Sequence, residues 1–170
     1  MEHQRRHYLR AGGMLALAGG LFSLQALKWP KAQAADLEHF EVSHTDAQWR
    51  AMLSDASYAV LRHEGTERPF SSPLNEEHRS GQFFCAGCQL ALFSSRTKFD
   101  SGTGWPSFWQ PLEHAVASRT DSSFGMERNE IHCTRCGGHL GHVFDDGPKP
   151  TGLRYCMNGV AMTFTPGRVS

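Results

Sequence analysis

The pattern of apolar and polar residues changes from a helical spacing to strand-like runs partway along the chain. Thr45 is a suitable N-cap for a helix over residues 45–53, and Gln48 stands at the third helical position, so the pair predicts a capping box. The apolar residues that this helix would place on one face are Trp49, Met52 and Leu53. Residues 54–63 predict a further helical turn before Gly65.

Beyond Gly81 the chain consists of short apolar runs separated by Gly, Ser and Pro, which is typical of antiparallel strands. The predicted strands span residues 82–85, 90–93, 114–119, 127–133, 143–144, 153–158 and 160–165. Because the predicted helices precede all the predicted strands, the sequence predicts a mainly β domain of the β-rich α+β class. Because the chain shows no repeat, long charge run or low-complexity tract, residues 35–170 are predicted to form a single domain.

Residues 1–34 have the pattern of a twin-arginine export signal. Arg5 and Arg6 open a basic segment, residues 11–27 carry no charge, and Ala32-Gln33-Ala34 supplies a small-residue cleavage pattern. We therefore expect cleavage after Ala34 and export to the periplasm. The alternative is an uncleaved membrane anchor, for which the uncharged stretch is of marginal length.

The charge balance argues against a protein whose main task is binding nucleic acid. The chain has 17 Lys and Arg and 17 Asp and Glu, and residues 35–170 keep 12 basic and 16 acidic side chains, a net charge of −4. A nucleic-acid-binding face is instead basic. The chain also has five cysteines, an odd number, which excludes a fully paired disulfide framework.

Four of the five cysteines form two Cys-x-x-Cys pairs, at residues 85 and 88 and at residues 133 and 136. Each pair lies on a predicted turn with a glycine inside it or directly after it, so both sulfurs of a pair can face one ion. The four candidate ligands are Cys85, Cys88, Cys133 and Cys136. Four thiolates leave no open position, which is typical of a structural zinc site. The alternatives are disulfides, which an exported chain could form, or a redox-active pair.

The fifth cysteine, Cys156, lies in a segment that alternates polar and apolar residues as a strand would. A period of two places Arg154, Cys156 and Asn158 on one face. A guanidinium beside a thiol favours the thiolate, which is the nucleophilic form. Cys156 is therefore a candidate nucleophile, and the alternative is a buried structural cysteine.

Two further segments carry candidate chemistry. Residues 139–146 contain two histidines, His139 and His142, and two acidic residues, Asp145 and Asp146. They form a candidate acid–base cluster close to the second cysteine pair. The alternatives are a solvated loop, or histidine ligands to the zinc ion, which four thiolates would already saturate. In the glycine-rich turn of residues 101–109, Trp105 is either a plug of the core or an aromatic wall for an apolar part of a substrate.

Together these stretches resemble the methionine-R-sulfoxide reductases, the B class of methionine sulfoxide reductases. The matching segments are residues 66–70, 98–108, 139–148 and 154–158 and the two cysteine pairs, and the resemblance covers about residues 42–164. It implies two antiparallel sheets with a few N-terminal helices and one structural zinc ion. It also implies that protein-bound methionine-R-sulfoxide is reduced to methionine.

The resemblance implies a role for each candidate residue. Cys156 would attack the sulfoxide sulfur and become a sulfenic acid. Trp105 would lie against the substrate methyl group. The residues that would handle the sulfoxide oxygen are His139, His142 and Asn158, while Asp146 would support His142 and Arg154 would support Cys156.

The chain departs from the family pattern at two positions. Thr103 stands where many members have a resolving cysteine, so we expect a single-cysteine cycle in which an external thiol, thioredoxin-like or other, reduces the sulfenic acid. Gly159 replaces the more usual serine after Asn158.

Three rival functions remain to be weighed against the reductase. The main rival is a non-catalytic binding module on the same zinc-containing β scaffold. A nucleic-acid-binding zinc ribbon conflicts with the net charge, and a thiol–disulfide oxidoreductase would need a second free cysteine. We expect a monomer that binds oxidised proteins and no nucleic acid.

Overall fold

A computed structural model describes residues 39–122 and 127–168, and both predicted helices lie near its start. Helix α1 spans Asp46–Met52, and the predicted capping box between Thr45 and Gln48 is present. The prediction of a shared buried face is wrong for Met52, since Trp49 is the buried residue of this helix. Trp49 is 3% exposed, whereas Met52 is 56% exposed.

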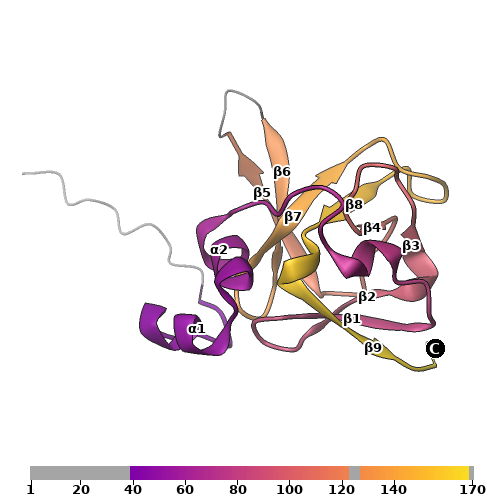
Figure 1. The fold of residues 1–170 in the computed structure, drawn as a ribbon. Coiled ribbons are helices and arrows are strands. Elements are labelled where there is room, and N and C mark those ends of the chain that lie inside the picture. The colour runs from indigo at the N-terminus through magenta and orange to yellow at the C-terminus, as the bar shows by residue number, and fades with distance from the viewer. Residues whose placement is uncertain (1–38, 123–126, 169–170) are drawn as a thin grey trace, which may run out of the picture. The chain divides into compact units, whose positions relative to one another are not determined.

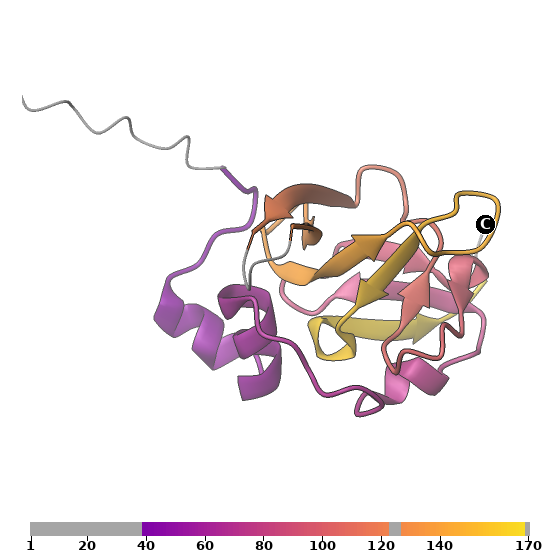
Figure 2. The same cartoon turned by 90° about the horizontal axis from the view of Figure 1, so that it is seen from above.

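Helix α2 spans Asp55–His63 and is longer than the predicted single turn. Its N-cap is Ser54, whose side chain accepts a hydrogen bond from the backbone N–H of Ser57. Tyr58 and Leu61 are buried in the core. Figures 1 and 2 show both helices at the same end of the strands.

All strand pairs are antiparallel, and the strands form two sheets, as the resemblance implies. The smaller sheet has the order β2-β1-β9, from Gly81–Cys85 (β1), Ala91–Ser94 (β2) and Met162–Pro166 (β9). The larger has the order β3-β4-β8-β7-β6-β5, from Lys98–Phe99 (β3), Ser107–Phe108 (β4), Val116–Asp121 (β5), Arg128–Cys133 (β6), His139–Phe144 (β7) and Arg154–Met157 (β8). Short 3-10 turns occupy Pro73–Glu76 (η1), Ser95–Thr97 (η2) and Gly159–Ala161 (η4).

The predicted strands correspond to seven of these, with shifted ends. Strands β3 and β4 were not predicted, because each has only two residues inside a segment rich in turn residues. Strand β7 is longer than the predicted residues 143–144 and includes both histidines of the acid–base cluster. The alternative of a solvated loop at these histidines is therefore wrong.

Aromatic side chains from both sheets meet in the core. Phe108 of β4 stacks on Phe93 of β2 with ring centroids 4.3 Å apart, and it meets Phe83 of β1 edge to face at 4.9 Å. Tyr155 of β8 reaches Phe93 from the larger sheet. Because residues alternate along a strand, this contact directs Arg154 and Cys156 to the opposite face of the larger sheet.

Within residues 39–122 and 127–168, none of the helices has the length and apolar character needed to cross a membrane. The predicted export signal at residues 1–34 lies outside the described residues, so its cleavage stays a prediction.

Candidate functional site

The four paired cysteines come together in one cluster. Their sulfur atoms all lie within 4.8 Å of one another. The sulfur of Cys85 is 3.7 Å from that of Cys136, and the sulfur of Cys88 is 3.5 Å from that of Cys133. Tetrahedral zinc, with Zn–S bonds of about 2.3 Å, would place its sulfur ligands about 3.8 Å apart. The donor set and its spacing therefore fit a structural metal site.

The two cysteine turns have the same backbone construction. In the first, Cys85 N–H donates to Leu90 and Cys85 C=O accepts from Gln89, at 2.8 and 2.9 Å. In the second, the amide of Cys133 donates to the carbonyl of residue 138 and its carbonyl accepts from the amide of residue 137, both at 2.9 Å. Each turn therefore presents its two sulfurs in the same way.

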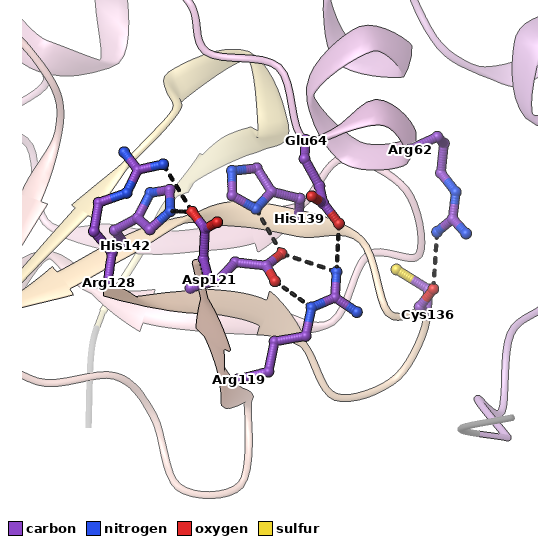
Figure 3. Close-up of polar contacts among 9 residues, drawn as sticks. Arg62, Glu64, Arg119, Asp121, Arg128, Cys136, His139 and His142 are labelled. Atoms are coloured by element: carbon purple, nitrogen blue, oxygen red, sulfur yellow. Dashed lines mark hydrogen bonds and ion pairs between the residues drawn. The ribbon is translucent and has the colours of Figure 1, made fainter. Parts of the chain in front are cut away.

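All five cysteines are free, which contradicts the disulfide alternative. Arginines link the cluster to its surroundings. The guanidinium of Arg62 on α2 donates to the carbonyl of Cys136 at 3.0 Å, as Figure 3 shows. Arg135, in the second turn, donates to the carbonyl of Cys88 in the first at 3.3 Å.

Cys156 lines a cavity of about 140 Å³ on the outer face of the larger sheet. Its lining includes Thr66, Trp105, His142, Phe144, Cys156 and Asn158. Trp105 is half-buried and stands outside the core cluster, so the alternative of a core plug is wrong. The structure thus brings Cys156, Trp105, His142 and Asn158 to one cavity, as the resemblance implies.

The environment of Cys156 differs in one respect from the prediction. Burial raises the pKa of the Cys156 thiol, and this outweighs the opposing effects of Thr103, Arg154 and Ser107, which favour the thiolate. The Thr103 hydroxyl lies 3.9 Å from the sulfur and 2.8 Å from the Ser101 hydroxyl. Arg154 alone does not make the resting residue a thiolate.

The acidic partner of His142 is Asp121, not Asp146 as predicted. His142 Nε2 lies 2.9 Å from the carboxylate of Asp121, which also accepts a hydrogen bond from Arg128 at 2.7 Å (Figure 3). Asp146 instead forms a two-pronged ion pair with Arg154, at 2.8 and 2.9 Å. Burial lowers the pKa of His142 more than the hydrogen bond to Asp121 raises it, so the ring is neutral at pH 7.

His139 is 2% exposed and lies behind His142, with the two ring centroids 5.4 Å apart. Its Nδ1 is 2.6 Å from the carboxylate of Glu130, which also pairs with Arg119. Arg119 reaches on to Glu64 at 2.8 Å (Figure 3). Burial alone would raise the pKa of Glu130, but the hydrogen bonds from His139 and Arg119 lower it to about 2. His139 therefore faces His142 and a carboxylate that is charged at neutral pH.

Sequence reasoning missed Glu67, which holds two walls of the cavity together. Its backbone N–H donates to the side-chain oxygen of Asn158 at 3.0 Å, and its carbonyl accepts from the indole of Trp105 at 3.1 Å. Asn158 is 4% exposed and also donates to the carbonyl of Leu140 at 3.1 Å. Glu67 stands inside the matching segment of residues 66–70, but nothing in that segment indicates these contacts.

The Glu67 carboxylate fixes the chain just beyond Asn158. It accepts hydrogen bonds from the backbone N–H groups of Gly159 and Val160, at 2.5 and 3.0 Å. A Cβ on residue 159 would lie 1.9 Å from the hydroxyl oxygen of Ser72. A side chain at position 159 would therefore displace Ser72 from its place in this structure.

A larger hollow of about 310 Å³ lies at the ends of β6 and β7, beside Glu127, Asn129 and Asp145. It shares Arg128 and Phe144 with the Cys156 cavity, but its lining includes none of the predicted site residues. The smaller cavity is therefore the candidate active site.

Comparisons with known proteins agree with this assignment. A family model, the SelR domain, matches residues 53–166. The chain is 56% identical over 123 residues to the peptide methionine sulfoxide reductase MsrB of Thiobacillus denitrificans, covering 72% of this chain and 93% of the relative. It is 52% identical over 133 residues to the MsrB of Agrobacterium fabrum, covering 78% and 98%, and 50% identical over 127 residues to that of Leptospira interrogans, covering 74% and 97%.

The cysteine cluster predicts that Cys133→Ser abolishes folding. Metal binding to such sites contributes on the order of 10 kcal/mol, as much as the whole stability of a typical domain. Circular dichroism and metal analysis of the purified variant would measure this, with Cys156→Ser as the control that keeps both fold and metal. A Cys133→Ser variant that melts like the unmodified chain would contradict a structural role for the cluster.

The Glu67 contacts predict that Glu67→Ala lowers the free energy of unfolding by about 2 kcal/mol, since two backbone N–H groups lose their acceptor. The walls of the cavity should also loosen, so that iodoacetamide alkylates Cys156 faster. Glu113→Ala is the matched control, because Glu113 lies on the surface beside His114. Equal alkylation rates of Cys156 in both variants would show that the Glu67 side chain does not hold the cavity walls.

Proposed function

The chain belongs to the SelR-domain family, together with the MsrB peptide methionine sulfoxide reductases, and on this basis we propose that it reduces methionine-R-sulfoxide in oxidised proteins. It is an enzyme, not a non-catalytic binding module. The observation that carries the proposal is the position of Cys156, a cysteine outside the metal cluster, in a cavity with Trp105 and His142.

The proposed reaction starts from the neutral thiol of Cys156. The Cys156 sulfur attacks the electrophilic sulfoxide sulfur, and the S–O bond of the substrate breaks. The products are methionine and Cys156 sulfenic acid. The Cys156 sulfur has gained the oxygen and has been oxidised by two electrons, which have reduced the substrate sulfur. The thiol proton stays with the transferred oxygen, which agrees with the raised pKa of Cys156. Trp105 supplies an apolar wall for the substrate methyl group.

His142 is proposed to move the proton during this step. It lies directly across the strand pair from Cys156, and Asp121 holds its Nε2. A neutral ring fixed in this way leaves Nδ1 to accept a proton from the thiol and to return it to the oxygen. Asn158 lines the same cavity, and His139 with Glu130 supports the His142 ring from behind.

The regeneration step is proposed to use an external thiol. Four of the five cysteines lie in the cluster, and the Thr103 hydroxyl, not a thiol, lies 3.9 Å from the Cys156 sulfur. An incoming thiol, thioredoxin-like or other, would attack the sulfenic acid and release water, and a second thiol would then free Cys156 from the mixed disulfide.

The ion of the cluster is proposed to be zinc, which four thiolates with no open position favour, and its task is structural. The adjacent arginines of residues 1–34 support export by the twin-arginine route to the periplasm. That route carries folded proteins, so the metal can bind before export. Fractionation of cells that produce the full chain tests this location.

The proposal predicts one methionine per chain when no reductant is present, because the cycle stops at the sulfenic acid. Mass spectrometry should then find one added oxygen on Cys156, and Cys156→Ser should release no methionine while its circular dichroism stays unchanged. A disulfide between Cys156 and another cysteine of the same chain would contradict the single-cysteine cycle. Methionine release by Cys156→Ser would remove Cys156 from the chemistry.

A further inference from the structure

Phe70 is unusually exposed for an aromatic residue. Within the described ranges 39–122 and 127–168, the large hydrophobic side chains that stand out to solvent are Phe70, at 70% exposed, and Met52, at 56%. Met52 lies at the end of α1, whereas Phe70 lies in the segment that holds the cavity walls.

The backbone at Phe70 is strained without a gain in burial. Residues 68–71 form a turn closed by a hydrogen bond from the Ser71 N–H to the Arg68 carbonyl at 3.3 Å, with Pro69 at its second position. Phe70 occupies the third position with φ of 61°, in the left-handed region that glycine favours in such a turn. A bulky residue there is an outlier, and its exposed ring recovers little of the cost through packing. Folding alone would therefore be served better by glycine.

Phe70 contacts the glycine-rich turn that supplies Trp105 to the active-site cavity. Its backbone N–H donates to the carbonyl of Gly104 at 2.7 Å, and its ring covers Gly104, where a Cβ would lie 2.7 Å from a ring carbon. Gly104 stands between Thr103, which is 3.9 Å from the Cys156 sulfur, and Trp105, which lines the cavity. Thr66, four residues before Phe70, lines the same cavity.

The cavity itself is too small for more than a side chain. Its volume is about 140 Å³, whereas sites that enclose a whole small molecule span about 300–1,000 Å³. If Cys156 reduces a methionine sulfoxide within a polypeptide, the neighbouring residues of that polypeptide must lie outside the cavity, across its rim.

We propose that Phe70 is a specificity-determining residue that packs against apolar side chains flanking the methionine sulfoxide of a polypeptide substrate. An exposed aromatic ring offers a large, rigid apolar contact at low entropic cost. The inference rests on the proposed function. It adds that the chain favours peptides with apolar neighbours over small methionine sulfoxide derivatives.

The test compares kcat/KM for two substrates in the full chain, with dithiothreitol as reductant. One substrate is a peptide with methionine-R-sulfoxide between leucines, and the other is N-acetyl-methionine-R-sulfoxide. Phe70→Gly should lower the ratio of the peptide value to the small-substrate value by about threefold to tenfold, the size of one aromatic contact. Its melting temperature should be equal or higher, because glycine relieves the strained backbone. Phe70→Trp should keep the ratio, and so should the control Met52→Ala.

An unchanged ratio in Phe70→Gly would overturn the inference, and so would a lower melting temperature, which would give the ring a folding role. An equal fall of the ratio in Met52→Ala would show a general surface effect and overturn it too. Failure of the proposed function is a separate result, because the unmodified chain would then turn over neither substrate.

Discussion

The four-sulfur cluster is the constraint on which the described fold depends. β1 of the smaller sheet ends at Cys85, and β6 of the larger sheet ends at Cys133, so one set of sulfur contacts joins the two sheets. β7 starts at His139, immediately beyond the second cysteine turn. The cluster therefore sets where this strand begins, and with it the position of both histidines relative to Cys156.

The residues with a proposed chemical role form one row across the larger sheet. Cys156 on β8 is paired with His142 on β7, which is paired with Glu130 on β6. Strand β5 extends the row to Arg119. A nucleophile, a neutral base, a charged carboxylate and a cation thus follow one another at the spacing of adjacent strands. The aromatic core on the opposite face holds this register, since a slip of one residue would reverse every side chain.

Spacing along the sequence predicted the parts of the site that come from residues close together in the chain. The cysteine pairs, the period of two that places Cys156 with Asn158, and the aromatic turn at Trp105 were all visible in the sequence. Asp121 was not, because it reaches His142 only through the register of β5, β6 and β7. The balance at Cys156 was not visible either, since the neighbouring residues show the charge of Arg154, which favours the thiolate, but not the burial that raises the pKa of the thiol.

The most direct test of the account is stereospecific turnover by the folded full chain containing one metal ion. N-acetyl-methionine-R-sulfoxide and its S epimer would be supplied separately, with dithiothreitol as the reductant, and methionine derivative would be measured over time. The account predicts turnover of the R epimer and none of the S epimer. Turnover of the S epimer, or of neither, would contradict it.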